Sequence, residues 1–427
     1  MIWILIPAIL AIGLAVLAAS FIASASGNGN LPAAAAPPSP TSTADASPPT
    51  RAPEVAVAAT ATTAASATLT PDLEALAVLT QLPATLVDDE IIPTSIPTAL
   101  PPEPPTETPV PAPPTNTPVP DQVATGPVDP LTGEAADPAK LARAPLVVMI
   151  DNHPDAAPQT GLNSASMVIE ALAEGGITRF ETFFLTGDAP TVGPVRSARP
   201  YFVEWAYPFK PLYVHCGGSW EAIDLIEEAT GILTDVDCFN GKMPFWRSND
   251  RLMPHNLYSS TTQLWKVAAN RGLSAPEGEP VFLHSAPLPP DQRPASGSVG
   301  FTFSGLSRSD ITWIYDHDSN QYLRKQWGYW HRDAATGDII NARNVVILWT
   351  NVWELPGDEK GRMGTDTVGT GTALIMRDGQ YEWGYWTRKN PYAPMTLLDG
   401  KREPMHLAPG RVWFEILGIG KKVQIGQ

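Results

Sequence analysis

The hydrophobic positions of this 427-residue chain fall into three zones, and the first is a single unbroken run. Residues 1–23, MIWILIPAILAIGLAVLAASFIA, contain no charged side chain, and about 20 apolar residues suffice for a membrane-spanning helix. The run is long for a signal peptide and no Lys or Arg precedes it, so an uncleaved anchor is favoured over a cleaved secretory signal. The favoured anchor predicts a single-pass protein of the cell membrane, and either alternative places the bulk of the chain outside the cytoplasm.

The second zone, residues 24–138, has no hydrophobic periodicity and is dominated by Ala, Pro and Thr, as in PPEPPTETPVPAPPTNTPVP. Such a composition buries too little apolar surface to offset the entropy of ordering, and proline-rich stretches favour extended polyproline II. We therefore predict a disordered stalk. It carries 13 acidic residues and one basic residue, so −12 of the net charge of −16 belongs to it. The nearly balanced remainder permits an anionic ligand.

In the third zone hydrophobic runs alternate with polar and glycine-rich segments from about Lys140. APLVVMIDN predicts a buried strand that ends at Asp151 and Asn152, and PLYVHCGGS predicts another that ends at His215. SWEAIDLIEEATG has the pattern of a helix with Ser219 as its N-cap. These elements predict a mixed α/β domain over residues 139–292.

MVIEALAEGGITRFETFFLT predicts a hairpin with a two-residue turn at the paired glycines. A regular ladder from that turn would place Glu170 directly opposite Glu181. Arg179 would then lie diagonal to Glu170 on the same face, where its guanidinium would relieve the repulsion between the two carboxylates.

Residues 293–427 change in character to aromatic and β-branched runs separated by turns, such as ITWIYDHDSNQYLRK and GTALIMRDGQYEWGYWTR. This pattern predicts a smaller, predominantly β domain. The fold class expected for the whole chain is therefore α+β, with the mixed domain first and the β domain second. The many Trp residues of the second domain are interpreted mainly as packing.

Two positively charged side chains, Arg196 and Arg199, lie in the stretch VGPVRSARPYF with no acid among them. The flanking prolines fix φ, so the arginines are expected on a stiff loop rather than on a free surface. His255 and Asn256 also follow a proline, ahead of a predicted helix in RLMPHNLYSSTTQLWKVAANRG.

The chain has two cysteines, Cys216 and Cys238. In an oxidising compartment they would form a disulfide that closes a loop of about twenty residues. Two buried thiols are the equally weighted alternative. No histidine stands near them at metal-ligand spacing, so no metal is expected.

Several stretches resemble the YerB-like lipoproteins, a bacterial two-domain family of unknown function: MIDNHPDAAPQTGL, ALAEGGITRFETFF, VGPVRSARPYFVE, YVHCGGS, PHNLYSS, ARNVVILW, VGTGTALIMRDGQYEWGYWTR and LAPGRVWFEIL. The resemblance spans nearly all of residues 140–420 and implies an envelope location but no reaction. Many family members are anchored through a lipidated cysteine, and this chain has none near its N-terminus. A spanning helix and stalk would take its place.

The polar candidates share positions at inferred strand ends, on the hairpin or in loops, where an α/β fold builds its cleft. We expect this cleft to bind an anionic cell-envelope ligand, either a glycan, a peptide carboxylate or a phosphate, through paired guanidinium hydrogen bonds. The expected ligand-binding residues are Asp151, Asn152, Glu170, Arg179, Arg196, Ser197, Arg199, His215, His255 and Asn256. The candidates for a catalytic role are Glu170, Glu181, Ser197, His215 and His255.

Three alternatives stay open at this point. Glu170 and Glu181 would suit a cell-wall glycan hydrolase if they were suitably spaced. A loose likeness to the LytR-CpsA-Psr phosphotransferases implies polymer attachment. The third alternative is a tethered protein–protein scaffold in which Arg196 and Arg199 neutralise Glu170, Glu181 and Asp151 in a buried network.

The remaining exclusions come from missing motifs. The chain has no GxSxG, HExxH, phosphate-loop or dinucleotide motif, so no cofactor is expected and an enzyme is neither favoured nor excluded. The absence of a basic stripe argues against nucleic acid as a partner. The expected partners are the membrane, through the N-terminal helix, and the envelope polymer or protein described above.

Overall fold

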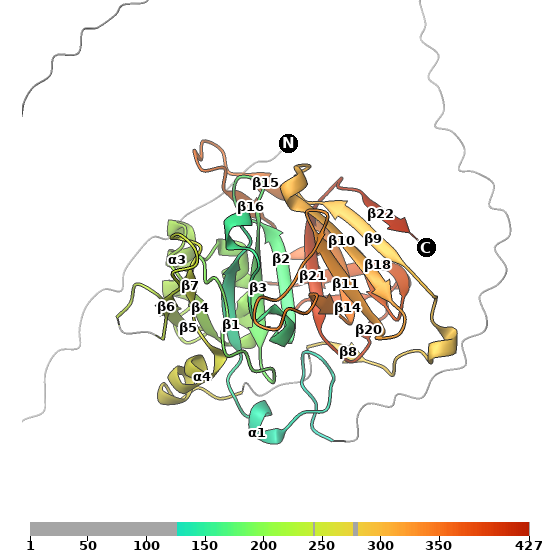
Figure 1. Cartoon of the computed structure of the whole chain (residues 1–427), viewed down its shortest axis with the longest axis horizontal. Helices are drawn as coiled ribbons and strands as arrows, with labels where there is room; N and C mark the ends of the chain where they lie inside the picture. Colours follow the sequence, from blue (N-terminus) through green and yellow to red (C-terminus); the bar gives the residue numbers. More distant parts are fainter. Residues whose placement is uncertain (1–125, 242–243, 276–280, 427) are drawn as a thin grey trace, which may run out of the picture. The chain divides into compact units, whose positions relative to one another are not determined.

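A ten-stranded sheet contains strands from both predicted domains (Figure 1). The computed structural model describes residues 126–241, 244–275 and 281–426. The strand order is β19-β18-β17-β14-β21-β2-β3-β1-β4-β5. The described part is rich in sheet and has few, short helices, which agrees in outline with the expected α+β class.

The first half of the chain supplies five neighbouring strands of this sheet. Every residue of β1, β2 and β3 is buried, as expected for strands that are covered on both faces. β1 is antiparallel to β3 and parallel to β4, and the predicted strand before Asp151 is confirmed as β1. The bounds are β1 (Leu146–Asp151), β2 (Met167–Leu172), β3 (Thr178–Phe184), β4 (Leu212–His215) and β5 (Thr234–Asp237).

The second half supplies the other five strands, and one of them joins the halves. β21 is parallel both to β2 and to β14, so a strand close to the C-terminus lies next to the hairpin of the first half. The two halves therefore share one continuous backbone ladder. The bounds are β14 (Asn344–Thr350), β17 (Gly369–Arg377), β18 (Gln380–Arg388), β19 (Thr396–Leu398) and β21 (Val412–Gly418).

A second sheet covers one face of the first. In β10 and β11 buried residues alternate with less buried ones, the pattern of strands with one buried face. Trp313 of β10 packs edge-on against Trp413 of β21, with ring centroids 5.3 Å apart. The bounds are β9 (Ser298–Thr302), β10 (Asp310–Asp316), β11 (Gln321–Gln326), β12 (Tyr329–Trp330), β13 (Asn341–Ala342) and β22 (Val423–Gly426).

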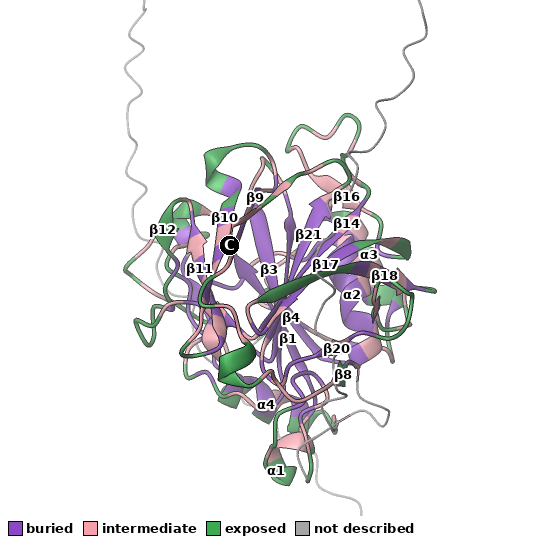
Figure 2. Cartoon of the chain, turned by 90° about the vertical axis from the view of Figure 1, so that its right-hand side faces the viewer, coloured by how far each residue is buried: buried purple, intermediate pink, exposed green. Residues whose placement is uncertain are grey.

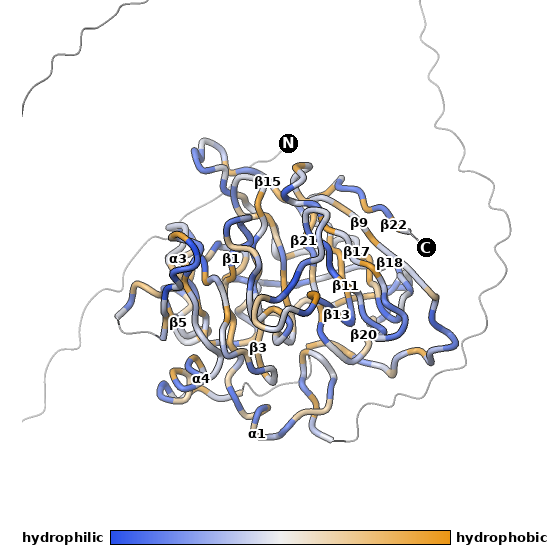
Figure 3. The backbone as a smooth tube through the Cα atoms, viewed as in Figure 1, coloured by the Kyte–Doolittle hydropathy of each residue, from blue (hydrophilic) through white to orange (hydrophobic). Residues whose placement is uncertain are grey.

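The interior is divided between the two faces of the long sheet. Along β1, Leu146, Val148 and Ile150 belong to the core shared with the second sheet, and Val147 and Met149 belong to the core on the other face. Figure 2 shows the buried strands of the long sheet in the interior and exposed turns at the periphery. In Figure 3 the hydrophobic stretches follow mainly the strands, and the outlying loops are largely hydrophilic.

The helices cover the sheet on both faces. α2 (Pro200–Ala206) and α3 (Trp220–Glu228) contribute side chains to the second core, and α4 (Thr261–Asn270) packs into the core shared with the second sheet. Ser219 caps α3 by accepting a hydrogen bond from Ala222 N, as predicted, and Ser260 caps α4 in the same way. One further short α-helix is α1 (Pro138–Leu141).

Short elements complete the described part of the chain. Three two-stranded ribbons are β6 (Trp246–Arg247) with β7 (Leu257–Tyr258), β8 (Leu283–His284) with β20 (His406–Leu407), and β15 (Val352–Glu354) with β16 (Met363–Thr365). The 3-10 helices are η2 (Pro154–Ala156), η3 (Leu162–Ser164), η4 (Tyr207–Phe209), η5 (Pro290–Gln292) and η6 (Ser307–Ser309). The loop between β6 and β7 and helix η2 become important for the candidate site.

The predicted register of the hairpin is wrong by one residue. Glu170 lies opposite Phe180, and Glu181 lies opposite Ile169. The Gly175–Gly176 turn forms as expected, with positive φ at both glycines. However, the backbone of Ile177 forms hydrogen bonds with both Ala173 and Glu174. Such a β-bulge shifts the register. Glu170 and Glu181 therefore face opposite sides of the sheet, because neighbouring side chains alternate.

The folded part begins earlier than predicted. Asp129, within the expected stalk, is fully buried, and its carboxylate accepts hydrogen bonds from Ser166, Thr186 and the backbone of Leu131. Most of the predicted stalk and the whole apolar segment 1–23 lie outside the described residues. Within the described ranges, no helix is both long and apolar enough to span a membrane.

Candidate functional site

The arginine loop is fixed by backbone hydrogen bonds on both sides. Asp151 N donates to Pro194 O, Arg196 N donates to Met149 O, and Val195 N donates to Leu257 O. The loop is therefore held between the end of β1 and the segment that begins β7. This agrees with the stiff mounting expected from its prolines, and it brings Arg196 beside Asp151.

Asp151 is the centre of the candidate site. Its Oδ2 lies 2.8 Å from His255 Nδ1 and 3.2 Å from Arg196 Nε. Its Oδ1 accepts a hydrogen bond from the backbone N of His153 at 3.0 Å. The Asp151 side chain is only 4% exposed, whereas that of Arg196 is 26% exposed. Three residues predicted from separate parts of the sequence, Asp151, Arg196 and His255, thus meet at one carboxylate.

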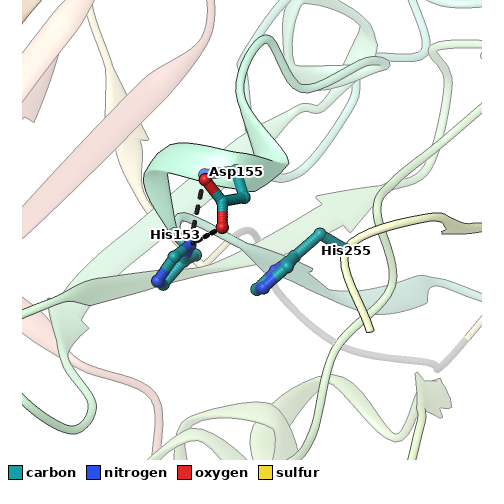
Figure 4. A group of neighbouring side chains, drawn as sticks. All are labelled: His153, Asp155 and His255. Carbon is teal, nitrogen blue, oxygen red and sulfur yellow. Dashed lines mark hydrogen bonds and ion pairs between the residues drawn. The ribbon is translucent and has the colours of Figure 1, made fainter. Parts of the chain in front are cut away.

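Two further side chains extend this site to the surface (Figure 4). The rings of His153 and His255 are stacked, with centroids 4.5 Å apart. His153 is the N-cap of η2, where its Nδ1 accepts a hydrogen bond from Asp155 N at 3.1 Å. Asp155 is exposed and its Oδ2 lies 3.6 Å from His153 Nδ1. We refer to Asp151, His153, Asp155, Arg196 and His255 as the Asp151 site.

Arg179 and Arg199 are paired with an acid that the sequence analysis did not consider. Glu174 lies 2.8 Å from Arg179 Nη2 and 2.7 Å from Arg199 Nη2, and Arg199 Nε also donates to it. Burial alone would raise the pKa of Glu174, but the charges of Arg179 and Arg199 outweigh burial and lower it to about 2. The two arginines are 4% and 9% exposed, so they do not join Arg196 at an open site.

Glu170 and Asn152 lie in a sealed polar network between the sheets. Glu170 forms an ion pair with Arg324 at 2.5 Å, and both side chains are 0% exposed. Asn152 donates to Thr178 and accepts a hydrogen bond from Gln326. The expectation that Glu170 and Asn152 line an open cleft is therefore corrected, because the second sheet covers them.

Two more buried groups belong to this network. Glu415 lies beside Glu170 in the ladder between β2 and β21. Burial and the charge of Glu170 raise the pKa of Glu415 well above its usual value, against the opposing charge of Arg324, so the neutral acid is favoured. His331 accepts from Arg324 through Nδ1, and burial followed by the charge of Arg324 lowers its pKa. The ion pair of this network is therefore the one between Glu170 and Arg324.

Glu181 lies in the other core, and the expected pairing with Arg196 or Arg199 is not found. It is fully buried, and neither carboxyl oxygen has a hydrogen-bond partner among the described residues. Burial raises the pKa of Glu181 well above its usual value, although the charge of Arg388 acts in the opposite direction. The neutral acid is therefore the favoured form.

The remaining candidates serve local structure. His215 is buried, with Nε2 2.8 Å from Asp235 Oδ1 and Nδ1 2.9 Å from Gly217 O. Asn256 holds its own loop by donating to Ser248 O and Arg251 O. The backbone oxygen of Ser197 accepts from Arg179. None of these contacts involves the Asp151 carboxylate.

Cys216 and Cys238 are joined by a disulfide, with Cα atoms 4.7 Å apart. They directly follow β4 and β5, so the bond fastens the ends of two parallel strands. Of the two alternatives considered for the cysteines, the structure contains the bonded one.

Removing this disulfide is expected to lower the free energy of unfolding by about 3 kcal/mol, because it constrains a loop of roughly twenty residues in the unfolded chain. The Cys216→Ala/Cys238→Ala variant and the wild type would be compared by urea unfolding with and without reductant. Reductant should destabilise only the wild type. Equal stability of the two proteins without reductant would contradict the expectation.

The residues missed by sequence reasoning share one cause: they become neighbours of the candidates only in the folded chain. Glu174 lies in the hairpin turn, and the fold places it beside both arginines. Arg324 occupies a buried position in the alternating pattern of β11, which was a usable signal for a polar interior. His153 and Asp155 lie two and four residues after the candidate Asp151, but only the fold brings them close to His255.

The comparisons with known proteins agree with this architecture. Residues 131–274 match the family described as "Protein of unknown function (DUF3048) N-terminal domain". Residues 301–414 match the corresponding C-terminal domain. The chain therefore belongs to this two-domain family of unknown function, and the resemblance to the YerB-like proteins is confirmed.

One relative and one solved structure make the likeness specific. The chain is 32% identical over 290 residues to "Putative lipoprotein YerB" of Bacillus subtilis (strain 168), covering 67% of this chain and 85% of the relative. A crystal structure of YerB protein from Bacillus subtilis matches with a TM-score of 0.61 and 29% identity, covering 70% of this chain and all of that one.

Proposed function

We propose that this protein is anchored in the cell membrane with its folded part outside the cytoplasm. The apolar segment 1–23 and the proline-rich segment after it support this location. The name of the relative, which describes that protein as a lipoprotein, also supports an envelope location. In this chain the apolar segment would supply the attachment.

We further propose that the Asp151 site binds an anionic group, a phosphate or a carboxylate, of a cell-envelope ligand. The observation that carries this proposal is the incomplete pairing of Arg196. Its Nε lies 3.2 Å from Asp151 Oδ2 but forms no hydrogen bond with any described residue, and its side chain is 26% exposed. The Asp151 carboxylate also forms hydrogen bonds with His255 and with the backbone of His153. Arg196 therefore keeps donors for a planar anion.

The other arginines favour the scaffold alternative, whereas the acids argue against the hydrolase alternative. Arg179 and Arg199 fit the scaffold alternative, because Glu174 satisfies both of them. A glycan hydrolase needs two carboxyl groups flanking a substrate, and Glu170 and Glu181 are buried on opposite faces of the sheet. The proposed anion site is therefore smaller than the cleft expected from the sequence and consists of Arg196 and the other residues of the Asp151 site.

Isothermal titration of the full-length protein in detergent, with inorganic phosphate, a muramyl peptide and a polyprenyl phosphate as probes, tests this function. We expect at least one probe to bind, and Arg196→Gln to weaken its binding at least tenfold, since a hydrogen bond to a charged group contributes about 1.5–3 kcal/mol. Arg332→Gln is the matched control, because Arg332 is exposed and remote in sequence. Binding that is equal in Arg196→Gln and the wild type would refute the proposal.

A further inference from the structure

Three potential metal ligands of the Asp151 site come from two distant segments of the chain. His153 and Asp155 lie at η2, directly after β1, and His255 comes from the loop between β6 and β7. One ligand atom from each of the three residues lies within 4.8 Å of the other two. In Figure 4 the two imidazole rings lie side by side, and the Asp155 carboxylate extends from η2 toward them.

Each histidine, in its neutral form, presents an unprotonated nitrogen. Neutral His255 donates from Nδ1 to the side chain of Asp151 at 2.8 Å, and its Nε2 then keeps a lone pair. His153 Nδ1 accepts from Asp155 N and therefore also carries a lone pair. A metal ion at His153 Nδ1 would displace only that one hydrogen bond. Neutral imidazole in this form is the form that binds metals.

Asp151 has the position of an outer-shell carboxylate. Metal-binding histidines commonly donate their second ring N–H to a carboxylate, which fixes the ring and its tautomer. Asp151 is 4% exposed and is itself held by Arg196 and by the backbone of His153. The His255 ring is consequently oriented by a rigid buried group, which is more than a chance meeting of surface side chains would provide.

We propose that His153, Asp155 and His255 bind a divalent first-row transition-metal ion of the Zn²⁺ type. Two imidazoles and one carboxylate suit such ions, and three protein ligands leave a coordination position open. Ligand atoms around tetrahedral zinc lie about 3.3 Å apart, so separations within 4.8 Å must shorten by up to about 1.5 Å on binding. The His153 and Asp155 side chains are 36% and 74% exposed, which leaves them room to move.

The metal would also explain how the site selects an anion. Arg196 and His255 both contact Oδ2 of Asp151, so the guanidinium and one proposed metal ligand share the same carboxylate. An anionic group that reached both would bind the metal and accept hydrogen bonds from Arg196. This bridging role rests on the proposed function, whereas the metal site itself does not.

The test uses the full-length protein purified without a polyhistidine tag and freed of metal by chelation. We expect calorimetry to give one Zn²⁺ per chain, and Co²⁺ to give the visible absorption of a low-symmetry site. His153→Ala, His255→Ala and Asp155→Ala should each weaken Zn²⁺ binding at least tenfold, and Asp151→Asn by about 10- to 100-fold. The Asp155 variant removes an exposed side chain, so its folding is not at risk.

His317→Ala and Asp318→Ala are the matched controls, because these residues form another exposed His–Asp pair with a separation of 3.3 Å. They should leave Zn²⁺ binding unchanged. A protein that binds no Zn²⁺, or binds it equally in all three ligand variants, overturns the metal site. If phosphate still binds through Arg196 in that metal-free protein, the proposed function stands alone. If Zn²⁺ binds but no anion does, the metal site stands and the anion function falls.

Discussion

Replacing Glu174 with Gln is expected to lower the free energy of unfolding at pH 7 by about 3 kcal/mol. The pKa of this carboxyl is lowered from 4.5 to about 2 by Arg179 and Arg199, and a shift of that size corresponds to about 3 kcal/mol. Gln removes the charge but keeps the shape, so two nearly buried guanidiniums lose their shared counter-ion. Urea unfolding of the full chain measures the difference.

The pH dependence of this effect follows from the direction of the shift. A carboxyl whose pKa is lowered in the folded state stabilises the fold fully above its unfolded pKa, and this stabilisation is lost as the pH falls. The gap between wild type and Glu174→Gln should therefore be widest above pH 4.5 and should close toward pH 2. Glu227→Gln, on the exposed side of α3, is the control and should change little. A gap that stays constant across this range would contradict the assignment.

The local elements of the first half could be predicted because each rests on nearby residues. The apolar run before Asp151 and the Ser219 cap need no distant contact, and both formed as expected. The hairpin turn also formed, but its register did not, because a bulge at Ala173 and Glu174 satisfies different backbone groups from those of a regular ladder. Period-two reasoning cannot detect an extra residue in one strand.

The site was predicted in part for a similar reason. Asp151, Arg196 and His255 were chosen separately, from a strand end and two proline-bounded loops, and the fold brings them to one carboxylate. Glu170 was chosen by the same reasoning but is covered by the second sheet, whose position depends on long-range packing. No local pattern in the sequence indicates that β11 would pack over β2 and bring Arg324 to Glu170.

Replacing Arg324 with Met is expected to have the largest effect on stability in the described part of the chain. Arg324 and Glu170 are both 0% exposed, and removing one partner of a buried ion pair costs about 3–5 kcal/mol because the other charge stays buried. The rings of Phe180, Trp313 and Trp413 surround the guanidinium at 5.5, 5.7 and 5.1 Å, so no water can readily replace it.

The double variant Glu170→Gln/Arg324→Met separates the cost of an unpaired charge from the cost of lost packing. Neutral Gln can still accept from Thr178, whose hydroxyl lies 2.5 Å from Glu170 Oε1, and Met fills part of the volume among the aromatic rings. Burial raises the pKa of Glu415 well above its usual value and favours the neutral acid, so the double variant removes both members of the buried ion pair at this point. We expect it to recover most of the stability that Arg324→Met loses in urea unfolding.

Arg332→Met, at an exposed arginine of the same segment, should remain close to the wild type. If the double variant is no more stable than the single one, the aromatic packing of Arg324 rather than its charge holds the two sheets together.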